Sequence, residues 1–148
     1  MKKWIIAIII LHLFVILYVI WGRSNEQDLG DNYYYLPLYE AVDIGYPYGA
    51  IIYKSAERNV FSDVKVHKNV INVNKNKDFI IVIQQDSGVN NNSSLPKAQD
   101  DKHLHYYIIA KQTDMVYGPF SQNEYLKKRD ELKIPNNLEF DSKEQCTK

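Results

Sequence analysis

The chain has 148 residues, which is enough for one domain of ordinary size. Its 18 Lys and Arg residues balance 18 Asp and Glu residues, so it lacks the basic surplus typical of nucleic-acid-binding proteins. Because 45% of the residues are apolar and only one is a cysteine, the composition also excludes a charged disordered protein, an internal disulfide and a four-cysteine zinc site.

The N-terminal segment is strongly apolar. Trp4–Trp21 is a run of 18 residues without a formal charge, and as a helix it would be about 27 Å long, which just spans a hydrocarbon core of about 30 Å. Lys2 and Lys3 precede it, so the positive-inside rule places the N-terminus in the cytoplasm and the rest of the chain outside. We therefore expect residues 1–22 to be a transmembrane anchor or uncleaved signal in the cytoplasmic membrane. The alternative is export after signal cleavage near residues 22–24, although signal peptides usually have a shorter apolar region.

The remaining chain divides by composition. Residues 23–32 are polar and are predicted to be a tether, residues 33–140 an extracytoplasmic β-rich domain, and residues 141–148 a disordered tail. Within the domain, β-branched and aromatic residues predict strands, and residues 86–102 predict a long polar loop. The predicted strands are 33–36, 50–53, 60–66, 70–73, 79–83, 104–110 and 115–117.

Two pairs of these runs predict hairpins. Residues 70–73 and 79–83 flank a short polar loop, and the uninterrupted apolar run 79–83 is expected to be a central strand covered on both faces. Residues 104–110 and 115–117 flank a polar bend, and Gly118-Pro119 is expected to end the second hairpin.

A C-terminal helix has the clearest local signal. Ser121 and Glu124 fit a capping box, Phe120 and Tyr125 fit the accompanying hydrophobic staple, and Pro135 is expected to end the helix. Because so short a helix is marginal alone, it must dock on the sheet. The predicted fold class is therefore α+β: an N-terminal transmembrane helix, then a small antiparallel β-meander with one C-terminal helix packed on it.

The twelve tyrosines suggest an interaction surface. Tyrosine is enriched in binding surfaces because it offers a large area and a polar tip, but it is also common in ordinary sheets. We expect a tyrosine-rich rim beside the 86–102 loop, with plain sheet packing as the alternative. The candidate residues are Tyr33, Tyr35, Tyr46, Tyr48 and Tyr107.

The sequence gives little sign of catalysis. It contains no G-x-S-x-G, no H-E-x-x-H and no phosphate-binding-loop motif, so we expect no enzyme activity, no catalytic residue and no cofactor. His103 and His105 would project to one side of a strand, and His67 could join them in a zinc or copper site. Two histidines at this spacing also occur by chance on half-exposed strands, so these three are minor candidates and no metal site is assigned.

Several segments together resemble a known family. They are 28–35, 51–53, 72–83, 106–109 and 111–120, and the most specific is Tyr117-Gly-Pro-Phe running into the Ser-capped helix. Over roughly residues 28–140 the chain resembles small, uncharacterised bacterial envelope proteins, a domain-of-unknown-function family often found as lipoproteins. The resemblance implies export and a small β-rich domain, and it supplies no catalytic residue. This chain has no lipid-attachment cysteine after its apolar run, so an uncleaved helix would replace the lipid anchor.

These observations predict an uncharacterised, membrane-anchored extracytoplasmic protein that acts as a non-catalytic binding or interaction module of the bacterial envelope. Its expected partners are the cytoplasmic membrane and another envelope protein, with no nucleic acid. Two alternatives remain: a small inhibitor or immunity-type protein that blocks an envelope enzyme, and a metal-binding sensor or enzyme built on the three histidines.

Overall fold

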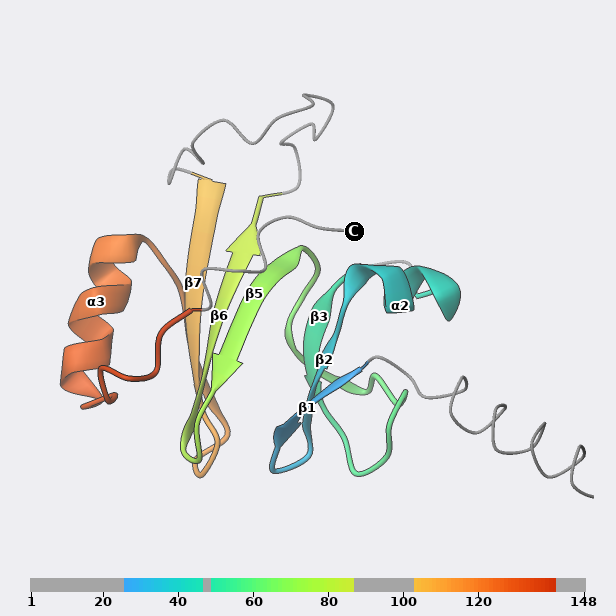
Figure 1. Ribbon diagram of the computed structural model, residues 1–148, viewed down its shortest axis with the longest axis horizontal. Helices are drawn as coiled ribbons and strands as arrows, with labels where there is room; N and C mark the ends of the chain where they lie inside the picture. Colours follow the sequence, from blue (N-terminus) through green and yellow to red (C-terminus); the bar gives the residue numbers. More distant parts are fainter. Residues whose placement is uncertain (1–25, 47–48, 87–102, 141–148) are drawn as a thin grey trace, which may run out of the picture.

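The computed structural model describes residues 26–46, 49–86 and 103–140. Over these ranges the chain forms two four-stranded antiparallel sheets and two helices (Figure 1). The predicted anchor over residues 1–22, the tail over 141–148 and nearly all of the predicted 86–102 loop lie outside the described residues. Within the described ranges, no helix combines the length and the hydropathy needed to cross a membrane.

The first sheet has the strand order β1-β2-β3-β4. Its strands are β1 (Gln27–Gly30), β2 (Tyr33–Leu36), β3 (Ile51–Lys54) and β4 (Asp63–Val66). Strand β1 lies inside the predicted tether, so the folded part begins earlier than the polar composition indicated. Leu29 is fully buried and holds β1 on the core, while Asp31 and Asn32 take φ of 53° and 65° in the tight turn to β2.

Strand β2 pairs on both sides although Pro37 follows it directly. The proline lies just outside the strand, at the N-cap of α2 (Leu38–Asp43), where its missing amide hydrogen breaks no ladder bond. Helix α2 was not predicted from the sequence, because six residues show less than two helical turns of periodicity. Ala41 is the buried residue of this helix.

The second sheet has the order β5-β6-β7-β8. Its strands are β5 (Val70–Lys75), β6 (Phe79–Gln85), β7 (Leu104–Ala110) and β8 (Met115–Phe120). Both predicted hairpins are confirmed, and β6 is central with four consecutive buried residues. Strand β8 runs through Gly118-Pro119 instead of ending there. It is an edge strand whose register with β7 shifts between Tyr106 and Ile108, and proline is tolerated at such an edge.

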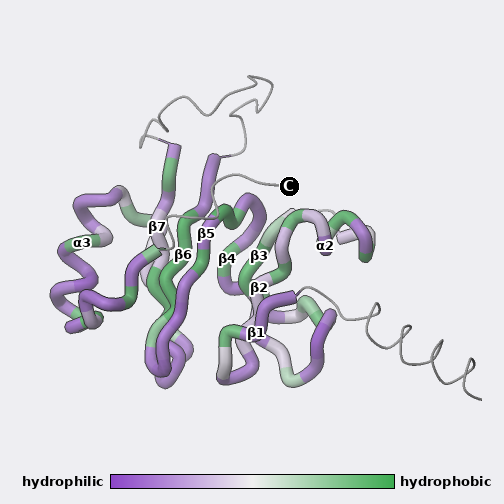
Figure 2. The backbone as a smooth tube through the Cα atoms, viewed as in Figure 1, coloured by the Kyte–Doolittle hydropathy of each residue, from purple (hydrophilic) through white to green (hydrophobic). Residues whose placement is uncertain are grey.

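The two sheets face each other across the main core. Ile52 and Val66 of the first sheet pack against Ile80, Val82 and Ile109 of the second. Figure 2 shows apolar residues concentrated in the inner strands β3 and β6. The expected antiparallel β-rich architecture is therefore present, but as two packed sheets, because the chain crosses between them at the short link after β4.

Helix α3 (Gln122–Glu131) docks on the outer face of the second sheet, as predicted (Figure 1). The Glu124 carboxylate accepts a hydrogen bond from the Ser121 backbone N–H at 2.9 Å, as the predicted capping box requires. The same carboxylate also accepts a hydrogen bond from Ser121 Oγ at 2.7 Å. Tyr125 is buried among Tyr106, Phe120 and other residues of that face. Lys133, with φ of 54°, turns the chain out of the helix before Pro135 is reached.

Candidate functional site

The predicted tyrosine rim is not one surface. Tyr33 is completely buried in the core between the sheets, and Tyr35 and Tyr107 pack half-buried against that same core. Tyr46 lies on the other side of the first sheet, and Tyr48 lies outside the described residues. The sequence could not separate these positions, because it did not show that the strands split into two facing layers.

The buried tyrosine Tyr33 belongs to a polar cluster that links the sheets. Its hydroxyl donates a hydrogen bond to the carboxylate of Asp114 at the β7–β8 turn. The ammonium groups of Lys65 and Lys54 lie 3.0 Å and 3.2 Å from oxygens of the same carboxylate. The hydrogen bond from Tyr33, assisted by the two lysines, lowers the pKa of the Asp114 carboxyl to about 2. Burial and the bond to Asp114 raise the pKa of the Tyr33 phenol. These groups satisfy one another, so their arrangement serves the fold.

A buried ammonium forms a second link between the sheets. Lys111 Nζ donates to the Leu29 carbonyl of β1 at 2.5 Å and lies 3.8 Å from Asp31 Oδ2. Burial lowers the pKa of this amine. Lys75 on the second sheet likewise donates to the Asp28 carbonyl of β1. Together these contacts fix β1, the first strand of the domain, to the second sheet.

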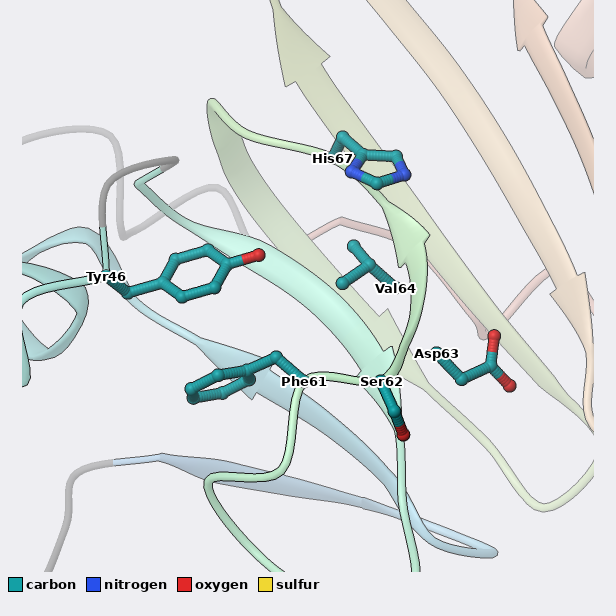
Figure 3. A pocket seen from close by; sticks show the side chains of 6 residues that line it. All are labelled: Tyr46, Phe61, Ser62, Asp63, Val64 and His67. Atoms are coloured by element: carbon teal, nitrogen blue, oxygen red, sulfur yellow. The ribbon is translucent and has the colours of Figure 1, made fainter.

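The three candidate histidines do not form one site. His105 Nε2 lies 2.8 Å from Asp86 Oδ1 and His103 Nδ1 lies 3.8 Å from Asp86 Oδ2, at the ends of β7 and β6. His67 instead follows β4 and lines a separate hollow (Figure 3). In the part of the chain that the structure describes, no group of three or more His, Cys, Asp or Glu side chains is arranged to hold a metal ion.

That hollow lies on the outer side of the first sheet and has a volume of about 470 Å³. Tyr46 and Phe61 form one wall, with ring centroids 4.7 Å apart, and Phe61 rests edge-on against Tyr53 beneath it. Figure 3 shows Val64 between this aromatic wall and His67, with Ser62 and Asp63 on the remaining border. The Asp63 carboxylate is paired with Lys65 at 2.8 Å. The hollow is lined by Tyr46, Phe61, Ser62, Asp63, Val64 and His67.

Two residues of this hollow were predicted from the sequence, for different reasons. Tyr46 was a candidate for the interaction surface and His67 a candidate metal ligand, and the fold brings them to the same concavity. Phe61, Ser62, Asp63 and Val64 were missed. They lie at the end of an irregular connection and in a short edge strand, where neither spacing nor a motif marks a site.

Large apolar side chains are also exposed in the stretch of chain before Phe61. Five of them fall within residues 38–60, whereas Met115 and Leu126 are exposed singly elsewhere in the described residues. Scattered single exposures are normal, but a concentration marks a surface for contacts. The five are Leu38 (60% exposed), Tyr39 (55%), Val42 (67%), Ile44 (43%) and Val60 (42%).

The fold and the hollow define a small two-sheet α+β domain with an open concavity on the outer side of its first sheet. The chain belongs to a family of proteins of unknown function, DUF3997, which it matches over residues 32–144. The resemblance to a domain-of-unknown-function family is thereby confirmed. Neither the curated proteins nor the solved structures contain a match to the chain.

Proposed function

We propose that this protein is a membrane-anchored, extracytoplasmic and non-catalytic interaction module, which contacts another protein of the bacterial envelope through the hollow on its first sheet. The observation that carries this proposal is the open hollow itself, which is walled by the ring pair Tyr46 and Phe61 and preceded in the chain by the exposed Val60. Protein–protein interfaces are enriched in aromatic residues at their centre and in polar residues at their rim. An aromatic wall with polar groups on its border fits that composition.

The anchoring part of the proposal is supported by the sequence. The uncharged run Trp4–Trp21 has the length of a membrane span, and Lys2 and Lys3 precede it. A domain that starts at Glu26 would then follow the membrane almost directly. The family resemblance to envelope proteins agrees with this location.

The shape of the hollow supports binding rather than catalysis. Enzyme sites generally exclude water and enclose their substrates, because charge stabilisation is strongest in a dry, preorganised cavity. Here the concavity is open, and its acidic side chain Asp63 is held by Lys65. A protruding side chain or loop of a partner protein fits such a surface better than a small substrate does.

Site-specific photocrosslinking tests the proposed contact surface. A photoreactive amino acid placed at His67, or at Ser62, is expected to capture one envelope protein when full-length chain is irradiated in native membranes. Both positions are exposed, so the replacement should not disturb the core. The matched control is Asn123, an exposed residue of α3 on the outer side of the opposite sheet.

A product obtained from His67 and Ser62 but not from Asn123 supports the proposal. Ser62→Arg should then reduce crosslinking from His67 several-fold, since it places a large charge on the border of the hollow. Identical products from all three positions, or products from Asn123 alone, contradict the proposed surface.

A further inference from the structure

We propose that the exposed apolar side of α2 docks on the outer surface of the lipid bilayer, so that the domain lies against the membrane instead of hanging from its anchor. The docking residues are Leu38, Val42 and Ile44, with Tyr39 beside them. This inference rests on the proposed function, because it requires residues 4–21 to be the anchor.

The first observation is the surface of α2 itself. Leu38 and Val42 are one helical turn apart and therefore share a face, and they are 60% and 67% exposed. Ala41 is the residue that packs onto the sheet, next to Leu36 and Ile51. The helix thus leaves its bulkiest apolar groups in solvent, although a water-soluble surface helix normally turns such groups inward.

The second observation is the position of α2 in the chain. Gln27, at the start of β1, pairs with Tyr35 of β2, and α2 begins three residues after Tyr35. Adjacent strands lie about 5 Å apart and each residue advances the chain by at most about 3.5 Å, so Leu38 is within roughly 15 Å of Gln27. Figure 1 shows the start of β1 and α2 on the same side of the first sheet.

The length of chain before Glu26 brings this side to the bilayer. Four residues, 22–25, separate the apolar run from the first described residue. Fully extended, they cover at most about 14 Å. A domain on so short a connection stays within reach of the lipid headgroups, and α2 follows the strand that pairs with β1, close to this connection.

The chemistry of the surface fits the interfacial zone of a bilayer. Aliphatic side chains enter the acyl boundary, while a tyrosine such as Tyr39 keeps its hydroxyl at headgroup level. The acidic residues of the helix are Glu40 and the exposed Asp43, and both must remain on the aqueous side. Arg58 lies close by, 3.9 Å from Glu26 and over the Tyr34 ring, where half of its side chain is open to phosphate groups.

Fluorescence quenching by lipid nitroxides tests the docking. Full-length chain carrying Cys146→Ser and Val42→Cys is labelled with an environment-sensitive fluorophore and reconstituted into phosphatidylethanolamine–phosphatidylglycerol vesicles. The vesicles contain phosphatidylcholine with a nitroxide just below the headgroup. The matched control carries the label at Leu126→Cys, which is 50% exposed on α3, on the far side of the other sheet.

We expect the label at Val42 to be quenched several-fold more strongly than the label at Leu126. Equal, weak quenching at both positions overturns the docking, and so does disulfide crosslinking between two unlabelled Val42→Cys chains, which would indicate that a second copy covers α2. Flotation of the vesicles after alkaline carbonate washing distinguishes a failure of the docking from a failure of the anchor. Chain that floats without quenching at Val42 refutes the docking alone, whereas chain that does not float refutes the anchor and the docking together.

Discussion

At the scale of single residues, the polar contacts between the sheets are concentrated on a few side chains. Asp114, at the β7–β8 turn, is the partner of Tyr33, Lys54 and Lys65 of the first sheet. It adopts φ of 57°, a conformation that Asp and Asn tolerate better than most residues. The side chain therefore has both the turn geometry and the charge that its position needs.

The depressed pKa of Asp114 makes stability depend on pH. Its folded-state pKa, about 2, is below the ordinary value of 3.8, so the stabilisation is complete above about pH 4 and is lost as the pH falls towards 2. Asp114→Asn keeps the turn conformation and removes the charge. Because 41% of the side chain is exposed, solvent screening limits the expected loss at neutral pH to about 1 kcal/mol.

Denaturant unfolding of the full-length protein in detergent, followed at pH 7 and at steps between pH 4 and 2, checks this expectation. The difference between native protein and Asp114→Asn should shrink as the pH falls. A difference that stays constant across this range would show that the carboxylate charge does not stabilise the fold.

Gly118 provides a second prediction at this scale. Its φ is 128°, and a Cβ placed there would lie 2.7 Å from the Tyr106 carbonyl oxygen, which belongs to the backbone and cannot move aside. Gly118→Ala should therefore destabilise the domain by about 3 kcal/mol or more.

The control for this substitution is Gly45→Ala. Gly45 also has positive φ, 71°, but the space that an alanine methyl group would occupy there is open, with nothing within 4 Å. The substitution should cost only about 1 kcal/mol. Thermal unfolding of both variants is the measurement, and equal shifts in Tm would show that the contact with Tyr106 is unimportant.

At the scale of elements, the sequence predicted best what is determined locally. Both hairpins of the second sheet and α3 were recognised because their signals are turn residues, alternation and a cap next to the element itself. Helix α2 was missed because it is too short to show a period. Strand β1 was missed because its polar residues stay exposed and Leu29 alone carries it into the core.

The docking of α3 depends on one side chain. Tyr125 is 3% exposed and stacks on Tyr106 with ring centroids 5.1 Å apart, and Phe140 closes the same aromatic group. Tyr125→Ala should cost about 3–4 kcal/mol, because it removes a large buried ring and leaves a cavity. Leu126→Ala, at the neighbouring exposed position, should change the free energy of unfolding by less than about 0.5 kcal/mol.

Equilibrium unfolding of the two variants decides this point. Similar losses from Tyr125→Ala and Leu126→Ala would mean that α3 does not depend on the aromatic contact. Tyr125 is the buried residue of α3, which shows how narrow the docked side of this helix is.

At the scale of the whole molecule, the candidate site could be predicted only in part. Tyr46 and His67 were candidates, but their meeting in one hollow depends on the packing of α2 and the 55–62 connection over the first sheet, which no local pattern encodes. The described tyrosines of the expected rim are divided for the same reason, since Tyr33 is buried between the sheets and Tyr46 lies on the outer side of the first sheet. A tyrosine count does not show which side of a sheet each ring occupies.

The inner and outer faces of the two sheets have different roles. The inner faces and the links through Asp114, Lys111 and Lys75 hold the sheets together. The outer face of the second sheet is covered by α3, whereas the outer face of the first sheet carries the hollow and the exposed residues of α2. In the proposed account, this second outer face is the one that meets the envelope partner and the lipid surface.

Protease accessibility of the full-length protein in intact protoplasts or spheroplasts tests the proposed location of the domain outside the cytoplasmic membrane. We expect the protein to stay with the membranes after carbonate washing and external protease to remove the domain over residues 26–140. Recovery of a washed-off protein that begins near Asn25, or a membrane-bound domain that external protease cannot reach, would contradict it.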